Sequence, residues 1–161
     1  MILTVDPGSK KAGVALFEPT GLLTTAWLVE GDNWRETADN VMRTLPVSAA
    51  RISAVCIEKM QIYDSTPLAH ANDCITLALM AGRVTGLFSG WLGDYTFEYF
   101  PRQWKGQAPK DISIERIKAE LLDEETRRLR LPKDKKKQLD VYDAVGIGCY
   151  HLRKERRALK R

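Results

Sequence analysis

The stretch Met1-Ile2-Leu3-Thr4-Val5-Asp6-Pro7-Gly8 contains the first expected strand of the chain and its first candidate functional group. Its apolar run predicts a strand over residues 2–6, and Pro7-Gly8 predicts the turn that ends this strand. A carboxylate at this point does little to stabilise a strand, but it places a negative charge at the edge of a sheet. Asp6 is therefore the first candidate functional residue.

The rest of the chain alternates between strand and helix patterns. Strands are expected at 13–18, 22–29, 52–58 and 95–100, and helices at 33–45, 67–91, about 111–128 and from about 138. Asn33 and Asp111 are candidate helix caps. Three antiparallel strands followed by αβαβα elements predict an α/β fold with a five-stranded mixed sheet flanked by helices. The length fits one domain, 1–161, with a basic tail at about 153–161.

Composition narrows the class of protein. No apolar stretch approaches the roughly 20 residues of a membrane span, and the N-terminal residues do not follow a signal-peptide pattern. The three cysteines show no close spacing of the kind that binds zinc, and their odd number fits a reducing compartment. The sequence therefore predicts a cytoplasmic protein without a membrane segment.

Charge is unevenly distributed along the chain. Residues 1–101 carry 7 Lys and Arg against 11 Asp and Glu, a net charge of −4. Residues 102–161 carry 18 Lys and Arg against 10 Asp and Glu, a net charge of +8. Clustered cations beside acidic residues favour a polyanionic partner such as nucleic acid. A solvated basic surface is the alternative, above all for the tail.

Three further acids accompany Asp6. Glu58 ends the second apolar strand, while Asp140 and Asp143 lie three residues apart, on one face of the last expected helix. If the strands at 2–6 and 52–58 are central parallel neighbours, Asp6 and Glu58 emerge at the same sheet edge. Oxygen ligands without nearby His or Cys select magnesium or manganese. The alternative is that these acids have only a structural role, in turns and at helix caps.

The helix expected at 67–91 has an unusual face. Ala78, Gly82, Gly86 and Gly90 recur every four residues and form a stripe with almost no side chain, while Ile75, Leu79 and Val84 are expected to face a core. Each glycine costs about 1 kcal/mol relative to alanine in a helix, so such a stripe indicates close packing. The packing partner is either the helix's own sheet or a second copy of the chain.

Five blocks in order resemble the RuvC family of Holliday-junction resolvases, within the RNase H-like nucleases. They are spread over most of the length of the chain, at residues 6–13, 54–58, 97–99 with 102–105, 113–116 and 139–144. The resemblance implies a homodimeric magnesium-dependent endonuclease that nicks two strands of a four-way DNA junction symmetrically. It implies dimer packing through the 67–91 helix. Whether a motor protein assists such an enzyme stays open.

The resemblance also implies residue roles. Asp6, Glu58, Asp140 and Asp143 would be catalytic ligands of two Mg²⁺ ions, with Mn²⁺ as a substitute, and Lys105 would lie near the scissile phosphate. The expected DNA contacts are Lys10, Lys11, Lys59, Gln61, Tyr63, Arg102, Lys105, Arg116, Lys133, Lys135, Lys136 and Lys137.

Some positions depart from the family pattern. The family's aromatic residue at the junction centre corresponds to Gln61 here, with Tyr63 two residues later, and Lys59 replaces a polar uncharged residue. These changes leave open whether other branched DNA is also cut. Two further alternatives are an RNase H-like nuclease that acts on RNA or RNA–DNA hybrids and a catalytically silent DNA-binding module.

Overall fold

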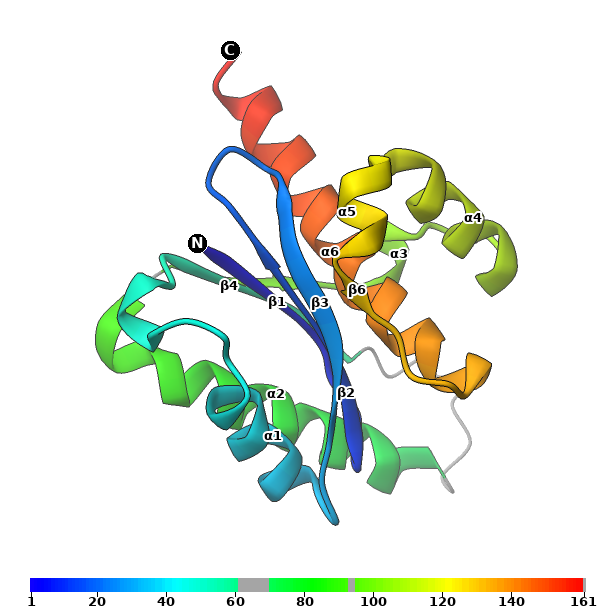
Figure 1. The fold of residues 1–161 in the computed structure, drawn as a ribbon. Helices are drawn as coiled ribbons and strands as arrows, with labels where there is room; N and C mark the ends of the chain where they lie inside the picture. Colours follow the sequence, from blue (N-terminus) through cyan, green and yellow to red (C-terminus); the bar gives the residue numbers. More distant parts are fainter. Residues whose placement is uncertain (61–69, 93–94, 161) are drawn as a thin grey trace.

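A computed structural model describes residues 1–60, 70–92 and 95–160 (Figure 1). Its centre is a mixed sheet in the order β5-β4-β1-β2-β3-β6. The strands are β1 (Ile2–Asp6), β2 (Lys11–Phe17), β3 (Leu23–Glu30), β4 (Ala54–Glu58), β5 (Thr96–Tyr99) and β6 (Leu129–Arg130). The helices are α1 (Trp34–Arg43), α2 (Ala71–Leu92), α3 (Pro101–Trp104), α4 (Lys110–Glu120), α5 (Asp123–Arg127) and α6 (Lys135–Ala158), with a 3₁₀ turn at Ala49–Arg51.

The sheet confirms the predicted α/β class and the antiparallel meander. β2 pairs antiparallel with β1 and β3, whereas β1 and β4 are parallel neighbours in the register Ile2–Ala54 to Val5–Ile57. The carboxyl ends of β1 and β4 therefore lie at one edge of the sheet. Asp6 and Glu58 thus lie at the same edge of the sheet, as predicted.

The predicted number of strands was wrong. A sixth strand, β6, pairs in parallel with β3 through Ala26–Leu129 and Trp27–Arg130. Two residues are too few to show the alternation that marks a strand in sequence. The tertiary contact with β3, and not a local pattern, makes this segment extended.

Several helix boundaries also differ from those expected. Asn33 does cap α1, since its Oδ1 accepts from the N–H groups of Arg35 and Glu36 at 3.0 and 3.1 Å. The helix expected at 111–128 is two helices, α4 and α5, and Pro109 rather than Asp111 takes the N-cap position. α6 starts three residues earlier than expected because the Asp134 carboxylate caps it.

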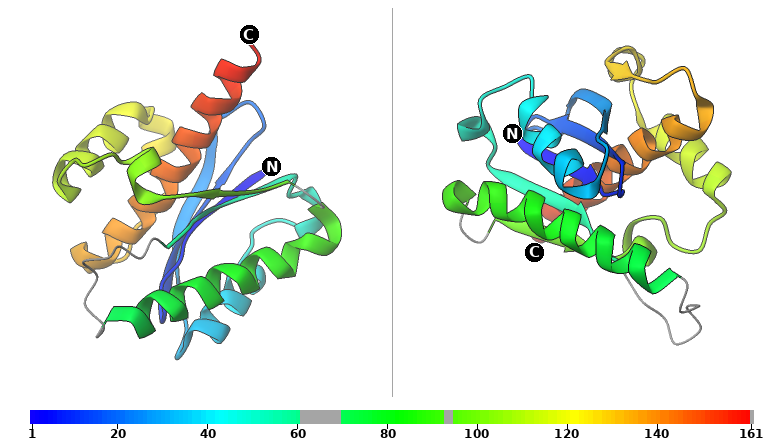
Figure 2. Two further views of the ribbon diagram at one scale, coloured as in Figure 1. Left: turned by 180° about the vertical axis from the view of Figure 1, so that it is seen from behind. Right: turned by 90° about the horizontal axis from the view of Figure 1, so that it is seen from below.

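The helices cover both faces of the sheet. α1 and α2 lie on one face, and α6 crosses the other face, with α3, α4 and α5 around it (Figure 2). Val41 of α1 and Met80, Val84 and Phe88 of α2 are fully buried in the first core. In the second core, Val141, Val145 and Ile147 of α6 pack over residues such as Phe17 of β2.

The glycine stripe of α2 does not contact its own sheet. Methyl groups built at Gly82, Gly86 and Gly90 would meet no atom within 4 Å among the residues that the structure describes. Ile75 and Leu79 are 53% and 49% exposed, so the expectation that they face the core was wrong. Helical spacing identifies an apolar face but not what covers it. None of the described helices is long and apolar enough to cross a membrane.

His151 of α6 is buried against β5. Its Nδ1 lies 2.8 Å from the hydroxyl oxygen of Tyr99, and the side chain is 2% exposed. Burial lowers the pKa of His151, because the charged ring loses its hydration in the folded protein. The unfolded chain therefore takes up this proton more readily than the folded chain, and the stability that the neutral ring contributes is lost as the pH falls below about 6.5.

We expect His151→Gln to flatten the pH dependence of unfolding between pH 7 and pH 5. The variant cannot take up the proton, while its amide can still accept from Tyr99. The free energy of unfolding from urea titrations at several pH values is the measurement. His70→Gln is the matched control, because His70 is exposed. An unchanged slope in His151→Gln would refute this account.

Candidate carboxylate site at the sheet edge

Asp6 lies at the centre of an acidic cluster. It ends β1 and is partly buried. The pKa of Asp6 is raised well above its usual range, first by burial, then by the charges of Glu58 and Asp143 and, more weakly, Asp140, while Lys105 opposes the shift. The structure thus brings all four predicted acids together, from β1, β4 and α6.

Glu58 is held by two donors from one short segment. The indole Nε1 of Trp104 donates to Glu58 Oε2 at 2.8 Å, and Lys105 Nζ lies 3.6 Å from the same oxygen. Burial raises the pKa of Glu58, and the Lys105 charge and the Trp104 hydrogen bond partly offset this shift. Glu58 is 8% exposed, so most of its side chain is shielded from solvent.

The two acids of α6 have different neighbours. Asp143 is 3% exposed, and its Oδ2 lies 3.3 Å from Lys110 Nζ and 3.9 Å from Lys105 Nζ. Its buried Oδ1 has no hydrogen-bond partner among the described residues. Asp140 is more open and pairs with Lys11, whose Nζ lies 2.5 Å from Oδ2. The positive charges of Lys11, Lys105 and Lys110 therefore offset the negative charges of these carboxylates.

Two backbone contacts fix α6 against the strands. The Thr4 hydroxyl donates to the carbonyl oxygen of Ala144 at 2.7 Å. A methyl group built at Gly13 of β2 would overlap the Asp140 carbonyl, so this glycine allows α6 to approach at backbone distance. These contacts set the position of Asp140 and Asp143 relative to Asp6.

Lys110 is a site residue that the sequence reasoning missed. It begins α4. Burial acts to lower the pKa of its amino group, but the charge and hydrogen bond of Asp143, together with the charges of Asp6 and Asp140, raise this pKa overall. No local pattern indicates this role, since Lys110 faces an acid on a helix distant in sequence. Trp104 lies in the block 102–105 that resembles the family, but the sequence did not indicate a contact between Trp104 and Glu58.

The donor chemistry of the cluster fits a divalent cation. Carboxylate oxygens suit Mg²⁺ or Mn²⁺, and the unpartnered Oδ1 of Asp143 is an available buried ligand. Within the described ranges, however, no three His, Cys, Asp or Glu side chains already stand in a metal-binding arrangement. The carboxylates would have to rearrange to hold such a cation.

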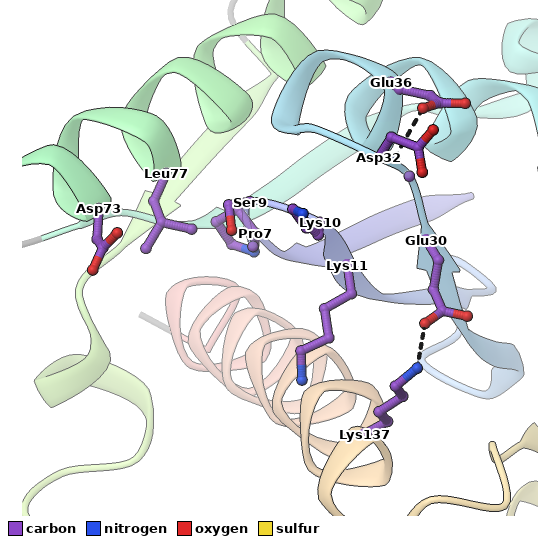
Figure 3. A pocket seen from close by; sticks show the side chains of 12 residues that line it. Pro7, Ser9, Lys10, Lys11, Glu30, Asp32, Glu36, Asp73, Leu77 and Lys137 are labelled. Atoms are coloured by element: carbon purple, nitrogen blue, oxygen red, sulfur yellow. Dashed lines mark hydrogen bonds and ion pairs between the residues drawn. The ribbon is translucent and has the colours of Figure 1, made fainter.

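A cavity of about 980 Å³ lies beside the acids and is not lined by them (Figure 3). Lys10 of the β1–β2 turn, Lys11 of β2 and Lys137 of α6 line it, and Lys137 pairs with Glu30 at 2.6 Å. Lys11 extends toward α6, where it reaches Asp140. The cavity also has acidic walls, at Asp32, Glu36 and Asp73 among others.

The other residues expected to bind DNA are spread over several segments of the chain, and two of them lie outside the described residues. Lys59 pairs with Glu98 at 2.6 Å. Arg102, Arg116, Lys133, Lys135 and Lys136 are exposed. Lys135–Lys137 form the first turn of α6, ahead of the helix start expected at about 138. Gln61 and Tyr63 lie outside the described residues.

Sequence comparison and structure comparison give different results. No protein-family model and no curated protein matches the sequence. Among solved structures, RuvC of T. thermophilus in complex with a Holliday junction substrate is 17% identical with a TM-score of 0.66, and the match covers 97% of this chain and 94% of that one. Fold similarity is therefore detectable at a level where sequence similarity is low.

Two further solved structures are similar to this chain over most of its length. The fowlpox virus resolvase, in complex with substrate Holliday junction DNA, is 17% identical with a TM-score of 0.54, over 96% of this chain and 97% of that one. The yeast mitochondrial Holliday junction resolvase is 11% identical with a TM-score of 0.55, over 98% of this chain and 83% of that one. The chain thus shares its fold with these three Holliday junction resolvases.

Proposed function

We propose that this protein is a metal-dependent endonuclease that resolves four-way DNA junctions by phosphodiester hydrolysis. The observation that carries the proposal is the convergence of Asp6, Glu58, Asp140 and Asp143 from two parallel strands and one helix, with lysines against them. A plain structural role does not explain why a fold would gather four acids at one sheet edge.

Each residue of the cluster would have its own role in the hydrolysis. Asp6, Glu58, Asp140 and Asp143 would hold the two Mg²⁺ or Mn²⁺ ions through their carboxylate oxygens. Such ions, when bound, supply an activated water and charge stabilisation at the phosphate. Lys105 and Lys110 lie within 4 Å of these carboxylates, so their amino groups can turn to the phosphate and offset its charge.

The surroundings of the acids suit a DNA backbone. Lys10, Arg102 and Arg116 are exposed on segments that flank the site, and Lys133, Lys135 and Lys136 are exposed around the start of α6. Each phosphate that they neutralise would release counterions and make binding weaken steeply with salt. A role in DNA resolution also fits the expected cytoplasmic location.

Cleavage of a synthetic mobile four-way junction in Mg²⁺, mapped on all four strands, tests the proposal. Paired symmetric nicks are the expected result. Three-way, flap, linear and RNA–DNA hybrid substrates in the same experiment separate a junction resolvase from a broader nuclease of branched DNA or an enzyme of RNA. Junction binding without nicks would indicate a catalytically silent module and refute the proposal.

We further propose that two copies associate through α2. Ile75 and Leu79 are exposed next to the glycine stripe, and together they form an apolar face that runs along the helix. Exposed apolar faces of this kind mark protein interfaces. A dimer would place two carboxylate sites on one junction, as symmetric nicking requires.

We expect Leu79→Glu to convert the protein to a monomer. A carboxylate at the centre of this face would be buried without a partner in the dimer, while the folded protomer should tolerate it at an exposed position. Sedimentation velocity gives the mass, and the junction assay should show single rather than paired nicks. Leu22→Glu is the matched control, because Leu22 is 46% exposed and lies away from α2. A variant that stays dimeric would exclude this face.

A further inference from the structure

Trp104 occupies an unusual place for a large aromatic residue. It ends the short helix α3 and is 8% exposed. Its indole Nε1 donates to Glu58 Oε2 at 2.8 Å, although Glu58 belongs to a different layer of the fold. A buried indole N–H needs a partner, and here the partner is a carboxylate of the proposed site.

A notch in α6 fixes the orientation of this ring. A methyl group built at Gly146 would lie 2.6 Å from Trp104 Cζ3 and 2.8 Å from Ile117 Cδ1, so only glycine leaves room there. The ring therefore packs between α6 and Ile117 of α4. Its N–H cannot swing away from Glu58 without a movement of these helices.

Trp104 and Lys105 act on the same carboxylate oxygen. Lys105 Nζ lies 3.6 Å from Glu58 Oε2 and 4.7 Å from the centre of the Trp104 ring. No described residue donates a hydrogen bond to the other oxygen, Oε1. Two consecutive residues thus orient Glu58 through one oxygen and leave the second oxygen for another ligand.

We propose that Trp104 is a positioning residue that presents Glu58 Oε1 to a divalent cation. The inference rests on the proposed function, because it gives Glu58 the role of a metal ligand. Hydrogen bonds to a ligating carboxylate commonly set its orientation, and their loss costs about 10–100-fold in metal affinity or activity. Gly146 contributes by holding the indole in place.

The test compares two Trp→Phe variants. Trp104→Phe keeps an aromatic ring and removes the donor to Glu58, whereas Trp27→Phe removes an equally buried indole that donates to Thr44 Oγ1 at 3.1 Å. We expect the Mg²⁺ concentration for half-maximal junction cleavage to rise about tenfold in Trp104→Phe and to stay unchanged in Trp27→Phe. Junction affinity without metal should be the same in all three proteins.

Tryptophan emission provides a readout that does not depend on cleavage. Mg²⁺ at Glu58 would change the surroundings of the Trp104 indole, so titration should change the emission of the wild type and of Trp27→Phe but not of Trp104→Phe. Gly146→Ala provides a second test of the same contact, because the added methyl group displaces the Trp104 ring while the indole N–H is retained. It should raise the Mg²⁺ requirement as Trp104→Phe does.

The outcomes separate the inference from the proposed function. If the wild type neither cleaves the junction nor responds to Mg²⁺, the proposed function fails. If the wild type cleaves and Trp104→Phe has the Mg²⁺ requirement and emission change of the wild type, the positioning role is wrong. Urea unfolding of each variant shows whether a loss of cleavage reflects a loss of fold.

Discussion

Asp6→Asn is expected to abolish junction cleavage and to make the protein more stable. The amide keeps the shape of the side chain but removes the negative charge at the centre of the acidic cluster. Metal ions contribute several kcal/mol to the stabilisation of a phosphoryl transition state, and a loss of about 4 kcal/mol is about 10³-fold in rate. Binding of the junction should survive, because the exposed cations are unchanged.

The gain in stability has a separate cause. Burial and the neighbouring acids raise the pKa of Asp6, so its charged form is unfavourable in the folded protein without metal. An uncharged amide removes this penalty at neutral pH. The urea midpoint without Mg²⁺ should therefore rise, and added Mg²⁺ should stabilise the wild type more than the variant.

Single-turnover cleavage and urea unfolding of the same preparations check both parts. Asp39→Asn is the matched control, because Asp39 pairs with Arg83 on the opposite face of the molecule, 2.7 Å from its Nε. It should cleave at the rate of the wild type. Cleavage by Asp6→Asn at that rate would refute the assignment of the site.

Gly13→Ala is expected to destabilise the fold and the site together. A methyl group at this position would overlap the carbonyl oxygen of Asp140 and lie 3.0 Å from the backbone nitrogen of Val141. Neither strand nor helix backbone can yield locally, so α6 must shift away from β2. Overpacking of this kind costs about 3 kcal/mol, and the shift would move Asp140 and Asp143 away from Asp6.

Gly82→Ala is the control for Gly13→Ala, and both are made in the Leu79→Glu protein so that the proposed contact between two copies of α2 is absent. A methyl group there would meet no described atom within 4 Å, and alanine is favoured over glycine in a helix by about 1 kcal/mol. Urea unfolding should thus separate the two variants in opposite directions. Equal stability of Gly13→Ala and the Leu79→Glu parent would mean that β2 and α6 are not in backbone contact.

Features with a local cause were predictable from the sequence. The meander follows from short apolar runs and turns, and Asp6 and Glu58 are marked because each ends such a run. The helix start at Asn33 follows from capping chemistry. The α/β class follows from the order of these elements, whereas the parallel pairing of β1 with β4 was only a condition on which the predicted site depended.

Features that depend on contacts between distant segments were not predictable. β6 is extended only because it pairs with β3, and Lys110 faces Asp143 only because α4 packs on α6. Lys135–Lys137 resemble a loop because charges lack an apolar period, yet Asp134 caps a helix there. Ile75 and Leu79 have core-like spacing, and only the structure shows that they are exposed.

The position of the acids along the chain has a consequence for how such an enzyme comes into being. Asp6 belongs to the first strand, whereas Asp140 and Asp143 belong to the last helix, which packs across one face of the sheet. Contacts between such distant segments carry a loop-closure cost and slow folding. Neither a chain still emerging from the ribosome nor a fragment trimmed before α6 could assemble the cluster. The ability to cut DNA would then be gained in one step, with the docking of α6.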